Sequence, residues 1–143
     1  MSIRRLILSI GILLSAMTGL RAQNVTDLII SEVMLADSTS IVNGYGEHCT
    51  WLELLNTSQG AVNFGGCYFS DDRNNLTKSP VLKGDKRTVL GARQVTLLYA
   101  TDKQGRGPFY FNFLPKPGST IYLVSNDGRT IIDSLAIPVG IVP

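Results

Sequence analysis

The stretch that decides the fold is STIYLVSNDGRTIIDSLAI, residues 119–137. Apolar and polar residues alternate on both sides of its centre, the turn sequence Asn126-Asp127-Gly128. An Asp-Gly pair between two alternating runs is typical of a tight β-hairpin. We therefore predict that residues 121–124 pair with residues 131–135.

The same pattern recurs along the rest of the chain. Runs rich in β-branched and aromatic residues, such as DLIISEVML, TWLELLN, GGCYFSD and QVTLLYA, alternate with turn sequences such as NGYGE, KGDK and PKPG. With 143 residues the chain forms one globular domain at most. Roughly six or seven strands at this spacing, without room for crossover helices, predict an all-β fold, an antiparallel sandwich or barrel.

The first 22 residues have the pattern of a secretory signal peptide. Arg4 and Arg5 form a basic segment, residues 6–14 an apolar one, and LRAQ contains a cleavage site after Ala22. The apolar segment is too short to span a membrane, which takes about 20 apolar residues. We therefore expect a signal peptide at residues 1–22 and an exported domain at residues 23–143.

Removal of the signal peptide changes the net charge. The whole chain has 13 Lys and Arg against 11 Asp and Glu, and residues 23–143 keep 10 basic and all 11 acidic residues. This slightly acidic balance is not the one that nucleic-acid binding or polybasic membrane docking requires. We expect neither kind of partner for the domain itself.

The two cysteines, Cys49 and Cys67, both lie in the part that we expect to be exported. An oxidising compartment permits one disulfide between them. Each cysteine stands beside an apolar strand pattern, so a bridge between neighbouring or facing strands is one interpretation, and burial as two free thiols is the other. The sequence leaves both open.

The segment TWLELLN contains the only tryptophan of the chain. In a strand, Trp51 and Glu53 share one face and Leu52 and Leu54 share the other. We expect the two leucines in the core and Trp51 over an outer surface or a loop.

His48 and Cys49 are the residue types of a base and a nucleophile. Adjacent residues of an extended chain project in opposite directions, so we interpret them as a loop histidine beside a structural cysteine. The sequence contains no Gly-x-Ser-x-Gly, His-Glu-x-x-His or Cys-x-x-Cys motif. We therefore expect neither an enzyme nor a cofactor or metal site.

Acidic residues are the only basis on which the sequence suggests an enzyme. Glu32 and Glu53 each lie in a predicted strand and could converge as paired carboxylates, and the turn DDRNN, residues 71–75, carries further oxygen ligands. The turn lacks the spacing of a known cation loop, and we interpret these residues as solvent-facing glutamates and as caps of backbone amides. A metal-assisted hydrolase that uses Glu32, Glu53 and Asp71 is the alternative.

Three segments carry a resemblance to a known family. IISEVML, TWLELLNTSQGAVNFGGCYFSDD and FNFLPKPGSTIYLVSNDGRTIIDSLAIP together resemble a lamin tail domain of the kind found in exported bacterial proteins, over about residues 28–138. The resemblance implies an immunoglobulin-like antiparallel β-sandwich. Its motif positions, all with a structural role, are Glu32, Trp51, Glu53, Asn56, Gly66, Asp71, Phe113 and Asp133.

The chain departs from the family pattern in two places. Thr50 precedes the tryptophan, where an acidic residue is frequent, and the chain ends at IPVGIVP, where relatives continue with one or two strands. A sandwich that lacks its last strand or strands would leave an unpaired sheet edge, which can pair with a partner.

The resemblance also gives a position to the aromatic run FYFNFLP, residues 109–115. The run would cross toward the next strand, with Phe113 and Leu114 filling the core. Tyr110 or Phe111, one of which has to face outward, is then the best candidate for a surface contact.

The function that the resemblance implies is binding rather than catalysis. We expect a periplasmic, envelope-associated or secreted bacterial module that tethers or supports other proteins through an exposed strand edge and loop faces. The partner would be a protein, and a membrane would be reached only through a partner or a longer parent chain. The alternative is an exported accessory domain of a longer membrane protein, such as one with a segment resembling the gamma subunit of oxaloacetate decarboxylase.

Overall fold

The computed structural model describes residues 2–5 and 24–140. Two single-turn 3-10 helices span Val25–Asp27 and Lys86–Thr88. The strands are β1 (Ser2–Arg4), β2 (Leu28–Met34), β3 (Trp51–Asn56), β4 (Val62–Asn63), β5 (Tyr68–Ser70), β6 (Ser79–Pro80), β7 (Val89–Leu90), β8 (Val95–Ala100), β9 (Tyr110–Phe111), β10 (Thr120–Val124) and β11 (Ile131–Ala136). Among these described residues, no helix has the length and apolar character that crossing a membrane requires.

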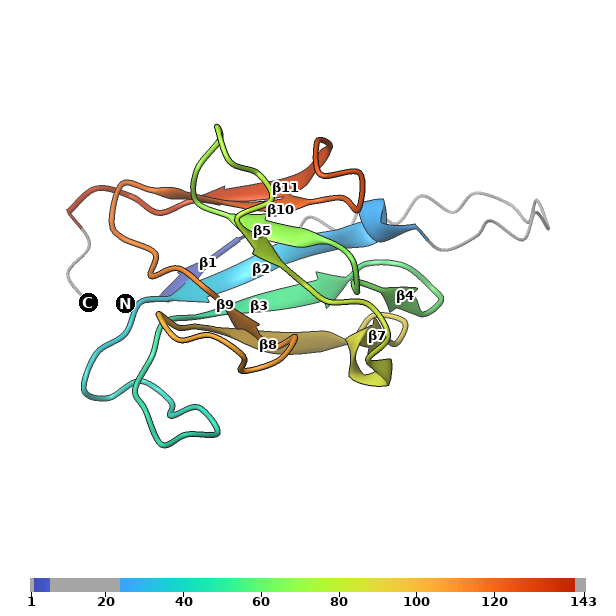
Figure 1. The fold of residues 1–143 in the computed structure, drawn as a ribbon. Helices are drawn as coiled ribbons and strands as arrows, with labels where there is room; N and C mark the ends of the chain where they lie inside the picture. Colours follow the sequence, from blue (N-terminus) through green and yellow to red (C-terminus); the bar gives the residue numbers. More distant parts are fainter. Residues whose placement is uncertain (1, 6–23, 141–143) are drawn as a thin grey trace.

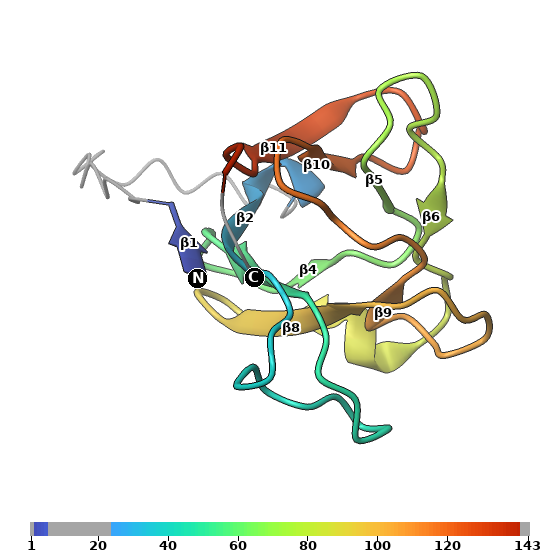
Figure 2. The same ribbon diagram turned by 90° about the vertical axis from the view of Figure 1, so that its left-hand side faces the viewer.

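The strands form two facing layers (Figure 1). One sheet has the order β1-β2-β3-β8-β9, the other has the order β11-β10-β5-β6, and β4 pairs with β7 at one end. Seen along the layers, β11 lies close to β2, while the loop of residues 35–50 extends beyond β8 on the outer side of its sheet (Figure 2). The predicted β-sandwich is confirmed.

The hairpin predicted from residues 119–137 is present. Ile121 pairs with Leu135 and Val124 with Ile131, so β10 and β11 are antiparallel neighbours. The carboxylate of Asp127 accepts hydrogen bonds from the backbone amides of the two residues after Gly128, each at 2.8 Å. The turn chemistry therefore closes the hairpin as expected, while an irregularity at Leu123 and Val124 shifts the register between the turn and Ile121.

One pair of neighbouring strands departs from the antiparallel pattern that the other pairs follow. All six predicted runs form strands, but β9 runs parallel to β8, with Tyr99 opposite Tyr110 and Ala100 opposite Phe111. The loop of residues 101–109 leaves the end of β8 and returns beside it, so the two strands point the same way. A parallel neighbour requires such a crossover, and the sequence pattern alone does not reveal one.

The N-terminal strand lies within the predicted signal peptide. Residues 2–4 form β1 and pair with β2 at the edge of its sheet. The apolar segment and the cleavage site predicted within residues 6–22 lie outside the described residues.

The core lies between the two sheets, and Leu52 and Leu54 face into it as predicted. Phe111 and Phe113 are also buried, with ring centroids 4.9 Å apart. Leu114 is 52% exposed, so its predicted place in the core is wrong. Phe111 as a surface contact is also wrong, because this residue is buried. Alternation turns residues 111 and 113 inward and leaves Tyr110 and Leu114 on the outer side.

Candidate functional site

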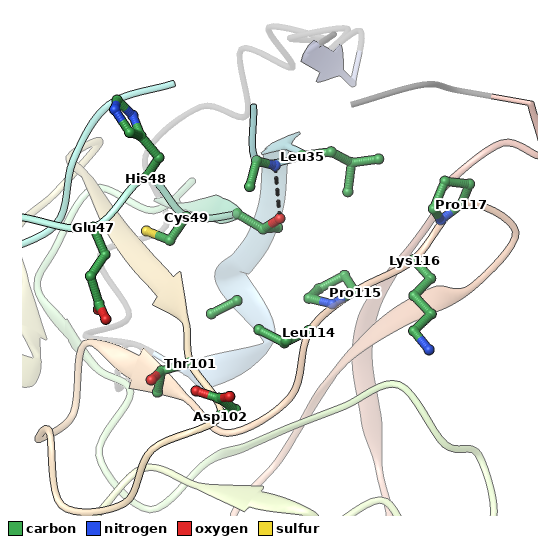
Figure 3. Close-up of a pocket in the computed structure, with 13 residues that line it drawn as sticks. Leu35, Glu47, His48, Cys49, Thr101, Asp102, Leu114, Pro115, Lys116 and Pro117 are labelled. Atoms are coloured by element: carbon green, nitrogen blue, oxygen red, sulfur yellow. Dashed lines mark hydrogen bonds between the residues drawn. The ribbon is translucent and has the colours of Figure 1, made fainter. Parts of the chain in front are cut away.

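His48 does not lie against the thiol of Cys49 as a catalytic base would. Its ring nitrogen Nδ1 donates a hydrogen bond to the backbone carbonyl oxygen of Ser40 at 2.6 Å, and the residue forms a bridge with Val42. The His48 ring and the Cys49 sulfur extend in different directions (Figure 3). His48 therefore shapes its own loop, which agrees with the interpretation as a loop histidine.

Both cysteines are free thiols. Cys67 belongs to the core between the sheets, whereas Cys49 lies outside that core, in the wall of a pocket, so the possible disulfide is not formed. Burial raises the pKa of the Cys67 thiol to about 11. Burial, and then the Glu47 carboxylate, raise the pKa of the Cys49 thiol as well. Neither thiol is activated as a nucleophile at neutral pH.

The pocket beside Cys49 has a volume of about 430 Å³. It lies between the end of β2, the approach to β3, the end of β8 and the segment of residues 114–117 (Figure 3). Leu114 and Pro115 supply part of an apolar wall, and Thr101 and Asp102 supply polar groups. Thr50, the residue that departs from the family pattern, uses its hydroxyl to accept a hydrogen bond from the amide of Ala36 at 2.9 Å. It therefore supports the wall of the pocket.

Glu32 and Glu53 lie beside each other, as the enzymatic alternative requires, so their interpretation as two separate solvent-facing glutamates is wrong. They are direct partners across β2 and β3, so their side chains lie on the same outer face of the sheet. The register shifts between Ile30 and Glu32, which makes Ser31 the extra residue of a β-bulge. The Ser31 hydroxyl donates a hydrogen bond to Glu53 Oε1 at 2.7 Å. The bulge residue Ser31 thus fixes the position of the Glu53 carboxylate beside Glu32.

The hydrolase alternative needs Asp71 beside this pair. Asp71 instead follows β5 in the other sheet and forms an ion pair with Lys78, with 2.7 Å between Oδ1 and Nζ. In the same turn Asp72, not Asp71, accepts a hydrogen bond from a backbone amide, that of Asn74. Among residues 2–5 and 24–140, no three His, Cys, Asp or Glu side chains gather as a metal site requires. The three acidic residues therefore do not form one centre.

Asp133 connects the two sheets. Its carboxylate accepts hydrogen bonds from the backbone amide of Ile30 at 2.8 Å and from Arg5 Nη1 at 2.5 Å. Ile30 stands at the bulge of β2, where the regular ladder is interrupted. Asp133 in β11 thus caps a main-chain group that the neighbouring sheet leaves free.

Asn56 is fully buried at the end of β3. Its Nδ2 donates to the carbonyl oxygens of Gly60, Leu90 and Gly91 at 2.8, 3.0 and 3.0 Å, and its Oδ1 accepts from the amide of Ser58 at 2.9 Å. One side chain therefore closes the turn after β3 and ties it to the turn before β8. This contact accounts structurally for an asparagine at the family-motif position.

Gly66 and Trp51 occupy two other motif positions. Gly66 has a φ of +89° in the turn before β5, and its amide donates to the carbonyl oxygen of Val81 at 2.7 Å. Trp51 stands opposite Met34 and Tyr99 on the outer face of its sheet, yet it is only 9% exposed. Its indole nitrogen is the one buried side-chain polar atom without a partner that the described part of the chain contains.

An aromatic surface lies beside Trp51, and we name it the tyrosine surface: Tyr45, Tyr99, Tyr110 and Arg106. The Tyr110 ring centroid is 5.6 Å from each of the other two tyrosine rings. The guanidinium of Arg106 lies 3.9 Å from the Tyr45 ring centroid and forms an ion pair with Glu47. Sequence reasoning found Tyr110 but missed the other members, which come from separate segments and share no local motif.

A second hollow borders the tyrosine surface. It has a volume of about 230 Å³, and Tyr110 and Arg106 line it together with Leu82, which is 71% exposed. Leu82 is thus an exposed apolar side chain in a hollow that Lys103, Gln104 and Asn112 also line.

Two β-sheets around a single core, with polar motif residues engaged in capping and turn contacts, define a β-sandwich module. The family model of the Lamin Tail Domain matches residues 21–138, and the chain belongs to this family. Lamin tail domains are immunoglobulin-like β-sandwiches and a non-enzymatic family. No curated protein and no solved structure matches the chain.

Proposed function

We propose that the chain is an exported, non-catalytic protein-binding module of the bacterial cell envelope, which tethers or supports other proteins. The leader pattern of residues 1–22 supports export, and the family supports a non-catalytic module. The single observation that carries the binding function is the tyrosine surface, where Arg106 lies against the 57% exposed ring of Tyr45.

Tyrosine is among the residues that most often dominate the binding energy of protein interfaces. Arg106, with only 11% of its side chain exposed, packs against the Tyr45 ring and supports it. Tyr110 is held by two aromatic neighbours, so its ring needs little ordering when a partner binds. Arg106 is held by Glu47, whose pKa is lowered first by its hydrogen bond with Arg106, so the pair stays charged at neutral pH. The hollow beside Leu82 can accept a side chain of the partner.

Photocrosslinking in the producing cells tests this proposal. A benzoylphenylalanine replaces Tyr45, and in a matched control it replaces Val89, which is also half exposed. Val89 belongs to β7, at the other end of the molecule from the loop that carries Tyr45 (Figure 1). We expect the envelope fraction to give a discrete heavier adduct from position 45 only, and Arg106→Ala to reduce it several-fold.

Other results would contradict parts of the proposal. Recovery of the chain in the cytoplasm with residues 1–22 retained would contradict export. The same adducts from positions 45 and 89 would contradict a specific surface. Hydrolysis of an ester, phosphate or glycan that is lost in Glu53→Ala would support the enzymatic alternative.

A further inference from the structure

Residues 2–5 of the same chain pair with the edge of β2 that faces away from β3. In β1, Ile3 pairs with Val33 and Arg4 with Glu32, in antiparallel register. The ladder continues at Arg5, whose amide donates to the carbonyl oxygen of Ser31 at 2.9 Å. The main chain of β2 therefore accepts an extended segment as an added strand, which is one of the recurring modes of peptide recognition.

Three consecutive side chains of this added strand make specific contacts with the rest of the protein. Ile3 packs against the hydrophobic core. Arg4 Nε lies 3.9 Å from Glu32 Oε2. Arg5 Nη1 donates to Asp133 Oδ1 at 2.5 Å, and its Nη2 donates to the carbonyl oxygen of Ser134. An apolar residue followed by two arginines thus contacts the core, Glu32 in one sheet and Asp133 in the other.

The edge of β2 that pairs with β1 is surrounded by carboxylates. Glu32 and Glu53 face each other across β2 and β3, and like charges in that position are unfavourable. Asp133 adds a third carboxylate, with only 13% of its side chain exposed. β2 also contains neither Lys nor Pro, residues that commonly protect a strand edge from pairing. Arginine side chains on an added strand offset the repulsion.

We propose that the β2 edge, with Glu32 and Asp133, binds a partner protein through an extended segment in which an apolar residue precedes two arginines. Residues 2–5 occupy this edge in cis, and their removal or displacement opens it. The inference extends the proposed binding function to a second surface, separate from the tyrosine surface.

Peptide binding tests the inference on two preparations. One is the protein as exporting cells release it, with its N-terminus read from the intact mass. The other is the full chain with Ile3→Asp and Arg5→Asp, which set carboxylates against the acidic edge and expel β1. The probe is a fluorescent peptide SIRRL, which copies residues 2–6, and the control peptide is SIEEL.

We expect SIRRL to bind the opened edge at least about tenfold more tightly than SIEEL, which corresponds to about 1.4 kcal/mol. The full wild-type chain, with β1 in place, should bind SIRRL at least about tenfold more weakly. Asp133→Asn should weaken binding of SIRRL to a similar extent. The amide oxygen of the new side chain can still accept the hydrogen bond from Ile30, so the fold is kept. Val89→Ala, the control, should leave binding unchanged. Bound SIRRL should slow hydrogen exchange of the β2 amides.

Equal affinity for the two peptides, or affinity that Asp133→Asn does not change in a folded protein, would overturn the inference. Failure of SIRRL to bind either preparation would also overturn the inference. Far-UV circular dichroism and thermal melting of every variant separate a lost site from a lost fold. Crosslinking from position 45 is measured independently, so either binding surface can fail without the other.

Discussion

The carboxylate of Asp133 in β11 accepts a hydrogen bond from the backbone amide of Ile30 in β2 at 2.8 Å. Ile30 is fully buried, so this amide has no access to water. An unsatisfied buried donor costs about 1–3 kcal/mol. We expect Asp133→Ala to lower the free energy of unfolding by about that amount in urea titration, and Asp133→Asn to cost less. Equal stability of Asp133→Ala and the wild type would show that another group satisfies the amide.

Asn56 is the most connected motif residue. Its replacement by alanine removes the donor that three carbonyl oxygens share, and we expect a loss of about 2–4 kcal/mol in the free energy of unfolding. Asn56→Asp should be at least as damaging, because a carboxylate would then face those oxygens. Thermal unfolding of both variants measures the effect. A loss below about 0.5 kcal/mol in both variants would contradict this role.

Phe111 and Leu114 test the corrected core. Phe111→Ala should cost about 3–5 kcal/mol, because it leaves a cavity between the sheets. Leu114→Ala, at a residue that is half exposed, should cost less than about 1 kcal/mol. Chemical denaturation of the two variants side by side gives the comparison. Similar losses would mean that Leu114 fills the core after all.

The two thiols should be protected in the folded protein. Because burial raises the pKa of Cys67 to about 11 and also raises that of Cys49, we expect little reaction with iodoacetamide at pH 7.5. In denaturant without a reducing agent, both should react, and the intact mass should rise by two labels. A mass two hydrogens below that of the reduced chain, with no labelling, would instead indicate a disulfide.

The Asp127 turn gives a pH dependence of stability. Hydrogen bonds from Thr130 lower the pKa of Asp127 to about 2, below the value of about 3.9 that the unfolded chain has. The folded state therefore gains stability above pH 4 that is lost as the pH falls from about 4 to about 2. Unfolding measured across this range should show a smaller slope for Asp127→Asn. An NMR titration of the Asp127 carboxyl with a midpoint near 4 would contradict the assignment.

The hairpin and the family were accessible to sequence reasoning. The pairing of β10 with β11 depends on one turn, whose Asp-Gly sequence is local. The resemblance to lamin tail domains is confirmed by the family match over residues 21–138. Bacterial origin and export stay predictions.

The tyrosine surface was not accessible in the same way. Tyr45 comes from the loop after β2, Tyr99 from β8 and Tyr110 from β9. They meet because β9 runs parallel to β8 and places Tyr110 opposite Tyr99. No periodicity within one segment encodes a parallel crossover, so only one member of the surface was predicted.

The sequence by itself determined the all-β class, the β10–β11 hairpin and the inward direction of Leu52 and Leu54. These features depend on side-chain alternation and turn residues within a few positions of each other. Only the tertiary structure decided that Asp133 caps Ile30, 103 residues away, and that Glu32 faces Glu53. Such contacts depend on strand order, bulges and register, which arise when the two sheets pack together.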